Sequence, residues 1–564
     1  MKKIIIITML LSLCLMIMTT GALAQEPQYG GTLKFSMYSS PEGLWIPARG
    51  ASTYDVNVNN MVYEPLIQLD KNMEPTIPRI AESWEFNDDK TKVTFKLRKD
   101  IKFHDGEPLT ARDVWYTYTQ IGHIDYEGTH MAYNSYLKGF DAFREDESQR
   151  GKALDYEAYM SGEEDYITGI QVINDYEIAF ESTDYSSRML ADRVLGIMPY
   201  HIWKDVPIKN QHLAEELEKP IGSGPFKFEE YARDEYVLLT AYEDYYLGRP
   251  YVDELIWAIR DQEVALMELE VGELHLAEFD PNSYNLIKGF EELDVYNDLS
   301  PVYQYMGFNL QDPKFTLKTR QAMAHAIDRQ GIVDSALLGF GEVVETPIVP
   351  FHWAHNPNLE GYDYNPEKAK KMLAEDGWEM GDDGVLTRDG MKFRVELLYP
   401  TGNQVRIQSA PIIQQNLAEV GIDARLNMTD WGTLLDKTER RGVPFNADQF
   451  DLVLVGLAGG VVPDQSAKYH SRNIPDGNYV GYSNEEFDKM LDDALTEPDR
   501  EKAVKLYWEI QEVMSHDLPV LTLYSPNRLT AVSSSIHNVR PEAVEDNDWR
   551  AFGLVNIHEW WIED

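Results

Sequence analysis

The chain has 564 residues, of which 43% are hydrophobic, so it is a globular protein too long for a single hydrophobic core, and two or more domains are expected. Its 51 basic and 95 acidic residues give a formal charge of −44. A surface this acidic repels nucleic acids and anionic lipids, which makes both poor partners, and it favours either a saline habitat or simple solubility outside the cell.

The first residues have the pattern of a secretory signal. Lys2 and Lys3 precede the apolar residues 4–18, and Ala24 ends a small-residue cleavage site, Ala-Leu-Ala, which predicts a mature start near Gln25. An uncleaved membrane anchor is the alternative, although the apolar core is shorter than the ~20 residues that a membrane span needs. Cleavage would leave a charge of 49 − 95 = −46.

Cysteine chemistry is excluded from the mature chain. The single cysteine, Cys14, lies within the predicted signal. A chain without cysteine tolerates an oxidising compartment, but it has no disulfide, no thiolate nucleophile and no cysteine-ligated metal centre.

The clearest local patterns lie in residues 81–118. Val93, Phe95 and Leu97 alternate with polar or charged residues, which predicts a half-buried strand. A His-Asp-Gly-Glu-Pro turn follows. Thr110, with an aspartate three residues later, then predicts the capped start of a helix.

Later segments predict alternating strands and helices. Residues 125–175 are acidic, rich in tyrosine and weakly periodic, which predicts an elaborated surface region. Asn365 before a proline predicts a helix start, and Gly377 predicts the end of that helix. The alternation favours mixed α/β layers. Further strands are expected at residues 176–180, 236–239, 393–399, 451–455 and 519–524, and further helices at 265–276, 319–329, 412–420 and 499–516.

The residue patterns offer little support for catalysis or metal binding. Residues 222–224 (Gly-Ser-Gly) fit a backbone turn better than a nucleophile elbow. His352 and His355 lie between prolines, which favours a loop over a helical zinc site. His325 is interpreted as structural, and residues 382–384 as a hairpin turn rather than a calcium loop. No catalytic residue, metal ligand or cofactor is therefore predicted.

Several segments in chain order resemble the landmarks of the extracellular solute-binding protein family 5. The densest is the 81–118 stretch, AESWEFNDDKTKVTFKLRKDIKFHDGEPLTARDVWYTY, which is similar to the hallmark segment of the family nearly residue for residue. This family contains the oligopeptide- and dipeptide-binding receptors of ABC importers. The resemblance covers roughly residues 29–530. The other similar segments are 61–70 (MVYEPLIQLD), 198–203 (MPYHIW), 221–228 (IGSGPFKF), 245–255 (YYLGRPYVDEL), 307–309 (GFN) and 319–329 (TRQAMAHAIDR).

The resemblance implies an α/β, two-lobed periplasmic-binding-protein type II-like fold with an additional inserted domain. It also implies a non-catalytic, monomeric substrate-binding protein of an ABC importer, located in the periplasm or outside the cell. Such a protein closes its two lobes around a small solute and delivers it to a permease in the membrane. By analogy, the domains are lobe I at 25–68, 196–300 and 525–564, the inserted domain at 69–195, and lobe II at 301–524.

The identity of the ligand depends on one departure from the family. Peptide-binding relatives resemble GWxADYxDP, with an aspartate that anchors the amino group of the ligand, whereas residues 456–464 read GLAGGVVPD. Leu457 takes the tryptophan position, and glycine or valine takes the place of the acid. Asp464 could substitute after a shift in loop register, or it is a surface turn residue. A longer peptide, an oligosaccharide or another polar solute all stay open, and a secreted hydrolase is the rival from another class.

Five further residues lie in segments that the resemblance places at the cleft. For each of them, packing in the core is the alternative to ligand contact. If the acidic charge extends into the cleft, it would favour cationic ligands. These residues are Trp45, Tyr305, Asn309, Trp431 and Tyr469.

Overall fold

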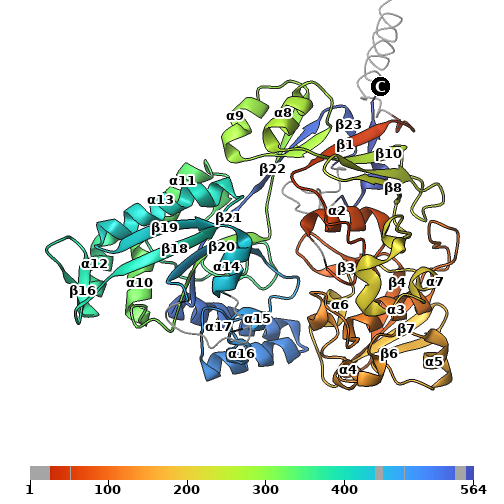
Figure 1. The fold of residues 1–564 in the computed structure, drawn as a ribbon, viewed down its shortest axis with the longest axis horizontal. Helices are drawn as coiled ribbons and strands as arrows, with labels where there is room; N and C mark the ends of the chain where they lie inside the picture. The colour runs from red at the N-terminus through yellow and green to blue at the C-terminus, as the bar shows by residue number, and fades with distance from the viewer. Residues whose placement is uncertain (1–25, 51, 439–448, 476, 540–553, 564) are drawn as a thin grey trace, which may run out of the picture.

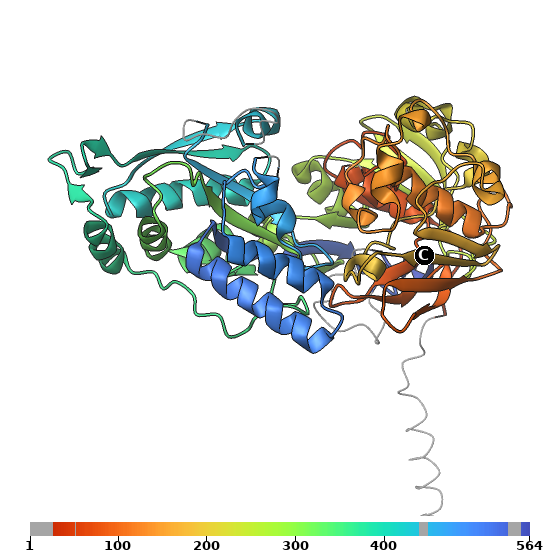
Figure 2. The same ribbon diagram turned by 90° about the horizontal axis from the view of Figure 1, so that it is seen from below.

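The computed structural model describes residues 26–50, 52–438, 449–475, 477–539 and 554–563. Two large bodies lie side by side, each around its own sheet (Figures 1 and 2). We call the body with the seven-stranded sheet the first lobe, and the body with the six-stranded sheet the second lobe. A four-stranded sheet with its helices, which we call the small domain, packs against the first lobe and shares its hydrophobic core.

The first lobe draws its strands from three distant parts of the chain. Its sheet has the order β12-β22-β11-β1-β10-β9-β8, in which β1 pairs in parallel with β10 and β11. Alternate residues of β1 are buried, as expected of a strand with one face toward the core. The elements are β1 (Thr32–Met37), β8 (Phe226–Ala232), β9 (Tyr236–Ala241), β10 (Glu254–Ile259), β11 (Leu276–Glu278), β12 (Leu293–Asp298), β22 (Arg528–Ser533), α2 (Thr53–Val62), α8 (Gln262–Glu270) and α9 (Tyr284–Ile287), with the hairpins β2 (Ile67–Leu69) to β3 (Pro75–Pro78) and β23 (Ile536–His537) to β24 (Trp561–Ile562).

The small domain contains most of the 81–118 stretch. Val93, Phe95 and Leu97 of β5 are buried as the alternation predicts, and Thr110 and Asp113 form the predicted capping box. The 125–175 region forms short helices and one strand, at residues 170–174. The sheet order is β4-β5-β7-β6. The elements are β4 (Ala81–Phe86), β5 (Lys92–Leu97), β6 (Ile170–Asn174), β7 (Glu177–Glu181), α3 (Ala111–Thr119), α4 (Phe140–Arg144), α5 (Tyr156–Ser161), α6 (Arg188–Ala191) and α7 (Tyr200–Trp203).

The second lobe has the strand order β14-β21-β13-β20-β18-β19. The prediction of a single helix through residues 319–329 is wrong at its end. The helix α10 ends at Ala326, and Asp328 caps the start of α11 by accepting a hydrogen bond from Gly331 N–H. The elements are β13 (Val302–Phe308), β14 (Gly341–Glu342), β15 (Glu379–Met380), β16 (Leu386–Arg388), β17 (Met391–Lys392), β18 (Arg394–Pro400), β19 (Asp423–Thr429), β20 (Leu452–Ala458), β21 (Val520–Pro526), α10 (Leu317–Ala326), α11 (Arg329–Ala336), α12 (Pro366–Glu375), α13 (Gln404–Glu419), α14 (Trp431–Thr438), α15 (Ser466–Tyr469), α16 (Glu485–Thr496) and α17 (Arg500–Asp517).

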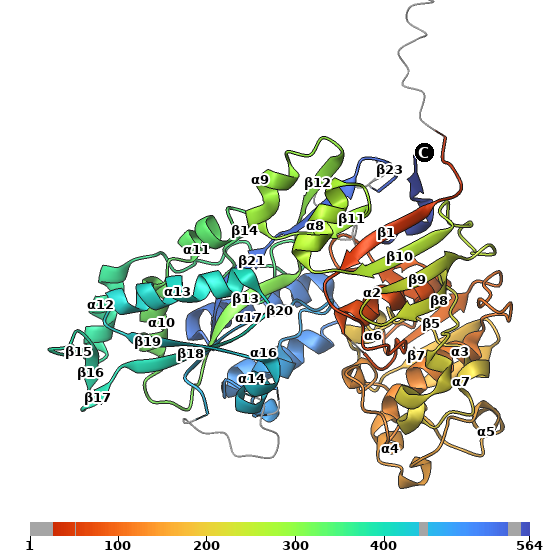
Figure 3. The same ribbon diagram turned by 45° about the horizontal axis from the view of Figure 1, so that its top comes forward.

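The chain crosses between the lobes through short connections. Residues 299–301 join β12 to β13, and Asn527 joins β21 back to β22. Figure 1 shows β21 leading into β22, and Figure 3 shows β12, α8 and α9 close to this junction. Because both crossings lie at the same ends of the two sheets, they are the natural place for a hinge.

A neutral histidine joins the 81–118 stretch to the Gly-Ser-Gly turn. His104 donates from Nε2 to the Gly224 carbonyl at 3.0 Å, and its Nδ1 accepts from Gly222 N–H at 3.3 Å. Burial lowers the pKa of His104 to about 4, so the ring is neutral at pH 7. The hydroxyl of Ser223 is buried and has no hydrogen-bond partner among the described residues, which fits a structural turn rather than a nucleophile.

Gly222 is expected to tolerate no side chain. A Cβ there would lie 1.9 Å from the carbonyl oxygen of Val62. Gly222→Ala should therefore lower the free energy of unfolding by about 3 kcal/mol through overpacking. Urea unfolding would measure the loss. Gly432→Ala is the control, because a Cβ at Gly432 would approach only a side-chain oxygen, at 3.2 Å. Equal effects of the two substitutions would contradict the steric argument.

Candidate functional site

The strand directions place the candidate site between the two sheets. β13 begins and β21 ends at the crossings. β20 runs antiparallel to β13, and β18 and β19 run parallel to β20, so the carboxyl ends of β18, β19 and β20 point toward the first lobe. In open α/β sheets, ligands bind at the carboxyl ends of strands. The loops after these three strands therefore form the second lobe's side of the site.

A buried arginine occupies this edge. Arg406 follows β18 as the third residue of α13, and it is only 4% exposed. Its Nε donates to Gln304 Oε1 at 3.2 Å, and its guanidinium carbon lies 5.6 Å from the centre of the Trp431 ring. Burial lowers the pKa of Arg406 from its ordinary value. Within the described part of the chain, no carboxylate forms an ion pair with Arg406.

A glycine makes this arrangement possible. Gln304 on β13 lies opposite Gly456 on β20, and a Cβ at Gly456 would come within 2.0 Å of Gln304 Nε2. Gly456 therefore leaves the space that the Gln304 side chain needs to reach Arg406. Sequence reasoning missed both Gln304 and Arg406, because glutamine and arginine are usually exposed and the helix was expected to begin only at residue 412.

The facing edge of the first lobe is acidic. β1 and β11 end at the edge near the crossings, which brings Tyr38, Glu278 and Asp280 to the site. Glu278 is exposed, yet the surrounding protein restricts its hydration and raises its pKa, while Arg528 opposes the shift. Burial also raises the pKa of Asp280. The two edges of the site thus differ in charge, acidic on the first lobe and cationic on the second.

The structure places three of the six predicted contact residues near the site. Trp431 follows β19 and is 46% exposed beside Arg406. Tyr305 and Tyr469 also lie toward this edge, but both are buried, and burial together with Tyr303 and Tyr305 raises the pKa of Tyr469 well above its usual value. The Tyr305 hydroxyl is hydrogen-bonded to that of Tyr479. Among these three, Trp431 alone exposes a broad aromatic face.

Two other predicted residues lie in the core. Trp45 is 1% exposed and packs against Phe228 and Tyr231, with ring centres 5.4 and 5.7 Å away. Asn309 follows the end of β13 that is remote from the crossings, and its Nδ2 donates to the Phe450 carbonyl at 2.9 Å. Their positions correspond to the core-packing alternative and do not bring them to the site.

Asp464 joins the second lobe to the small domain. Its Oδ2 lies 3.4 Å from Arg188 Nη1 of the small domain, and its Oδ1 accepts from Ser466 N–H at 2.8 Å. Arg188 also pairs with the buried Asp192, whose pKa burial raises to about 6 against the opposing charge of Arg188. Asp464 is therefore a turn residue, but its carboxylate is engaged by an arginine rather than free at the surface.

The loop after β20 is held by a neutral histidine. His352 donates from Nε2 to the Val461 carbonyl at 3.2 Å, and its Nδ1 accepts from Ala354 N–H at 3.1 Å. His355 bonds to the Ile348 carbonyl. Both histidines lie in a loop, as predicted, and each ring is hydrogen-bonded to backbone groups. Burial lowers the pKa of His352 to about 4.

Protonation of His352 is expected to destabilise the fold. Because the pKa is lower in the folded chain than its ordinary 6.5, the stabilisation is complete above pH 6.5 and declines as the pH falls toward 4. At about 1.4 kcal/mol per pKa unit, the wild type should lose about 2–3 kcal/mol more than His352→Gln between pH 7 and about 4.5. Urea unfolding at both pH values would measure this. Parallel losses in the two proteins would contradict it.

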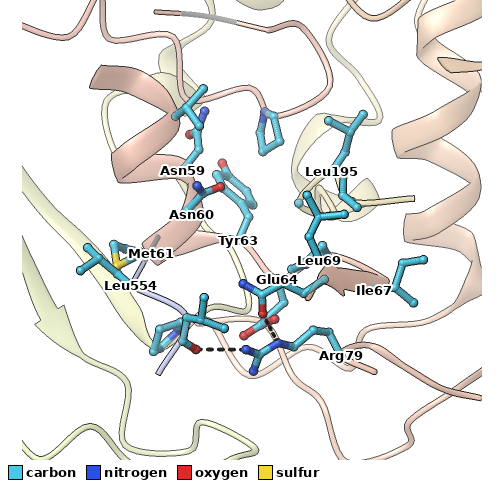
Figure 4. Close-up of a pocket in the computed structure, with 18 of the residues that line it drawn as sticks. Asn59, Asn60, Met61, Tyr63, Glu64, Ile67, Leu69, Arg79, Leu195 and Leu554 are labelled. Carbon is cyan, nitrogen blue, oxygen red and sulfur yellow. Dashed lines mark hydrogen bonds between the residues drawn. The ribbon is translucent and has the colours of Figure 1, made fainter. Parts of the chain in front are cut away.

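A cavity of about 400 Å³ lies beside α2, between the first lobe and the small domain (Figure 4). Its wall contains two buried charges that are satisfied internally. Glu64 accepts from the Tyr245 hydroxyl, while Arg79 donates to Gln68 Oε1 at 2.5 Å and to the Val555 carbonyl at 3.0 Å. The cavity does not include the strand ends of the second lobe, so it is distinct from the site between the sheets.

Residues 76–478 match the model of a protein family. The description of this family is bacterial extracellular solute-binding proteins, family 5, middle. The chain belongs to this family. It is 33% identical over 546 residues to the oligopeptide-binding protein AppA of Bacillus subtilis, covering 96% of this chain and 93% of that one. It is 26% identical to the dipeptide-binding protein of Escherichia coli, covering 92% and 94%. The resemblance seen in the sequence is thus confirmed.

The fold of the family agrees with the two lobes described above. The solved structure of AppA from Bacillus subtilis in complex with a nonapeptide superposes with a TM-score of 0.77 at 31% identity, covering 96% of this chain and all of that one. The predicted two-lobed fold with an inserted domain is confirmed, and so is a substrate-binding role. Helices of the described residues all fall short of the length and apolarity that a membrane span requires. The predicted signal peptide lies outside the described residues.

Proposed function

We propose that the protein captures an oligopeptide with a free carboxylate between its two lobes and delivers it to the permease of an ABC importer. The observation that carries this proposal is Arg406, a buried cation at the carboxyl ends of the strands with no acidic partner among the described residues. A desolvated guanidinium binds a carboxylate through short, charge-assisted hydrogen bonds. Its place in the first turn of α13 adds the favourable field of the helix N-terminus.

The proposed contacts on the second lobe are Arg406, Gln304 and Trp431. Tyr305 and Tyr469 would support them from below, and Asp464 would act through its pair with Arg188. Trp45 and Asn309 are left out because they pack in the core. The carboxylates of Glu278 and Asp280 on the facing edge would favour a cationic group elsewhere on the same ligand.

We also propose the domain boundaries 25–68, 196–300 and 525–564 for lobe I, 69–195 for the inserted domain, and 301–524 for lobe II. The origin of the strands supports this division, because the second-lobe sheet uses residues 302–526 and the four-stranded sheet of the small domain uses residues 81–181. The protein would act as a monomer without a cofactor, in the periplasm or outside the cell, after cleavage of the signal near Ala24.

Thermal unfolding with matched ligands tests this function. A nonapeptide with a free C-terminus should raise the melting temperature, because a ligand that binds only the folded state stabilises it. The same peptide with a C-terminal amide should give a much smaller shift, because it cannot pair with Arg406. Equal shifts would contradict the role of Arg406. A response to oligosaccharides alone would favour a sugar receptor that stacks its ligand on Trp431, and turnover of the peptide would favour a hydrolase.

A further inference from the structure

The two lobes touch again at a distance from the crossings, where the small domain meets the second lobe. Glu74 forms an ion pair with Arg500, and Lys90 Nζ donates to the Pro498 carbonyl at 2.7 Å. Ser187 N–H donates to the Leu495 carbonyl at 3.0 Å. With the Arg188–Asp464 pair, these contacts form a second junction between the lobes, on the side opposite the chain crossings.

This second junction encloses a chamber of about 280 Å³. The volume is below the roughly 300–1,000 Å³ of sites that hold a whole drug-sized ligand, so it suits one part of a larger ligand. Both lobes contribute to the wall, and most of its side chains are apolar or aromatic. Those used in the argument are Phe86, Tyr185 and Leu190 from the small domain, and Trp353, Val461 and Val462 from the second lobe.

The charged groups around the chamber already have partners. Arg500 pairs with Glu74 and also lies 3.2 Å above the centre of the Trp353 ring. Lys90 is held by the Pro498 carbonyl. Because these groups are engaged, a charged occupant would have to break existing contacts, whereas an apolar occupant would only displace water.

The chamber adjoins the proposed peptide site. Val461 and Val462 lie three and four residues beyond the carboxyl end of β20, in the loop that His352 holds by its bond to the Val461 carbonyl. This loop is the GLAGGVVPD segment, in which residues 456–463 are all apolar or glycine. The loop that begins at the carboxyl end of β20 thus leads directly from the proposed site to the chamber.

We propose that this inter-lobe chamber receives one bulky apolar side chain of the bound peptide, and that the protein thereby selects peptides with an aromatic or branched aliphatic residue at one fixed position. The inference rests on the proposed function, because it takes the ligand to be a peptide. An occupant that contacts Leu190 on one side and Val462 on the other also adds apolar contacts between the lobes, which favours the closed arrangement.

The test is a phenylalanine scan along a nonapeptide of alternating alanine and serine, with affinities measured by titration calorimetry. At one position, phenylalanine should raise the affinity about tenfold or more over the parent peptide, as burial of an aromatic side chain predicts. Val462→Trp, which fills the chamber, should abolish that preference while the parent peptide still binds. Leu213→Trp, on an exposed residue outside the chamber, should keep the preference.

The outcomes separate the two proposals. Peptide binding with a flat scan, or a preference that persists in Val462→Trp, would overturn the chamber and leave the peptide function intact. Failure of every peptide to bind the wild type would overturn both. Val462→Leu serves as a second variant in case tryptophan prevents closure, because it reduces the volume with little change in shape and should weaken the preference without removing it.

Discussion

Replacing Arg406 with methionine should lower the affinity for a nonapeptide with a free C-terminus by about 100-fold or more. A buried cation that pairs with a carboxylate contributes about 2–5 kcal/mol when one partner is truncated. Without peptide, the same substitution should leave the free energy of unfolding unchanged or raise it, because Arg406 is desolvated and unpaired by acids in the described structure. Calorimetry and urea unfolding would measure the two effects.

A structural role for Arg406 would give the opposite pattern. If the arginine mainly supported the packing of α13, its loss would destabilise the protein and would weaken binding of the amidated and free-acid peptides alike. Arg425→Met is the matched control, since Arg425 lies on the neighbouring strand β19 but is exposed. The control should change neither quantity. Unchanged affinity in Arg406→Met would refute the proposed site.

Replacing Arg329 with methionine should cost about 3–5 kcal/mol of folding free energy, the range for breaking a buried ion pair from one side. Arg329 is 4% exposed and binds both carboxylate oxygens of Glu345, at 2.9 and 3.0 Å. It also donates to the carbonyls of Tyr362, Val344 and Thr522. Its loss leaves the half-buried carboxylate of Glu345 and several carbonyls without a donor.

Urea unfolding would measure this loss of folding free energy, and a double substitution tests its cause. Glu345→Leu in the Arg329→Met background removes the orphaned carboxylate and should restore part of the stability. A loss below about 1 kcal/mol in the single variant would mean that water replaces the arginine, as it does at exposed ion pairs. Peptide selectivity should stay unchanged, since Arg329 lies on α11, outside the proposed contacts.

The sequence predicts those parts of the fold that depend on local pattern. Val93, Phe95 and Leu97 alternate over six residues, and Thr110 needs only its neighbour Asp113 to cap a helix. The failure at 319–329 has a local cause as well, because Asp328 can either continue a helix or cap the next one, and only the packed structure decides between them. Pro411 lies inside α13, which extends well upstream of the expected start at residue 412.

The site was harder to predict because it depends on strand order. Nothing near Arg406 in the sequence indicates that β18, β19 and β20 end at one edge, or that Gln304, more than a hundred residues earlier, lies beneath it. For Asp464 the sequence leaves a ligand anchor and a surface turn residue open, and it does not indicate the ion pair because the partner, Arg188, comes from another domain. Trp45 lies in the loop after β1 and Trp431 begins α14, and only tertiary packing separates the buried tryptophan from the exposed one.

The place of β22 in the first sheet has a consequence for the order in which the protein matures. β12 pairs with β22, and β22 also pairs with β11, so a strand near the end of the chain separates two strands made much earlier. While the chain is being made, β12 lacks its partner strand and β11 is paired only with β1, until residues 528–533 emerge. The second lobe, whose sheet uses residues 302–526, can be complete sooner. The lobe that contains the first strand is therefore expected to be the last to acquire its native sheet, which keeps the chain incompletely folded until almost all of it has been synthesised.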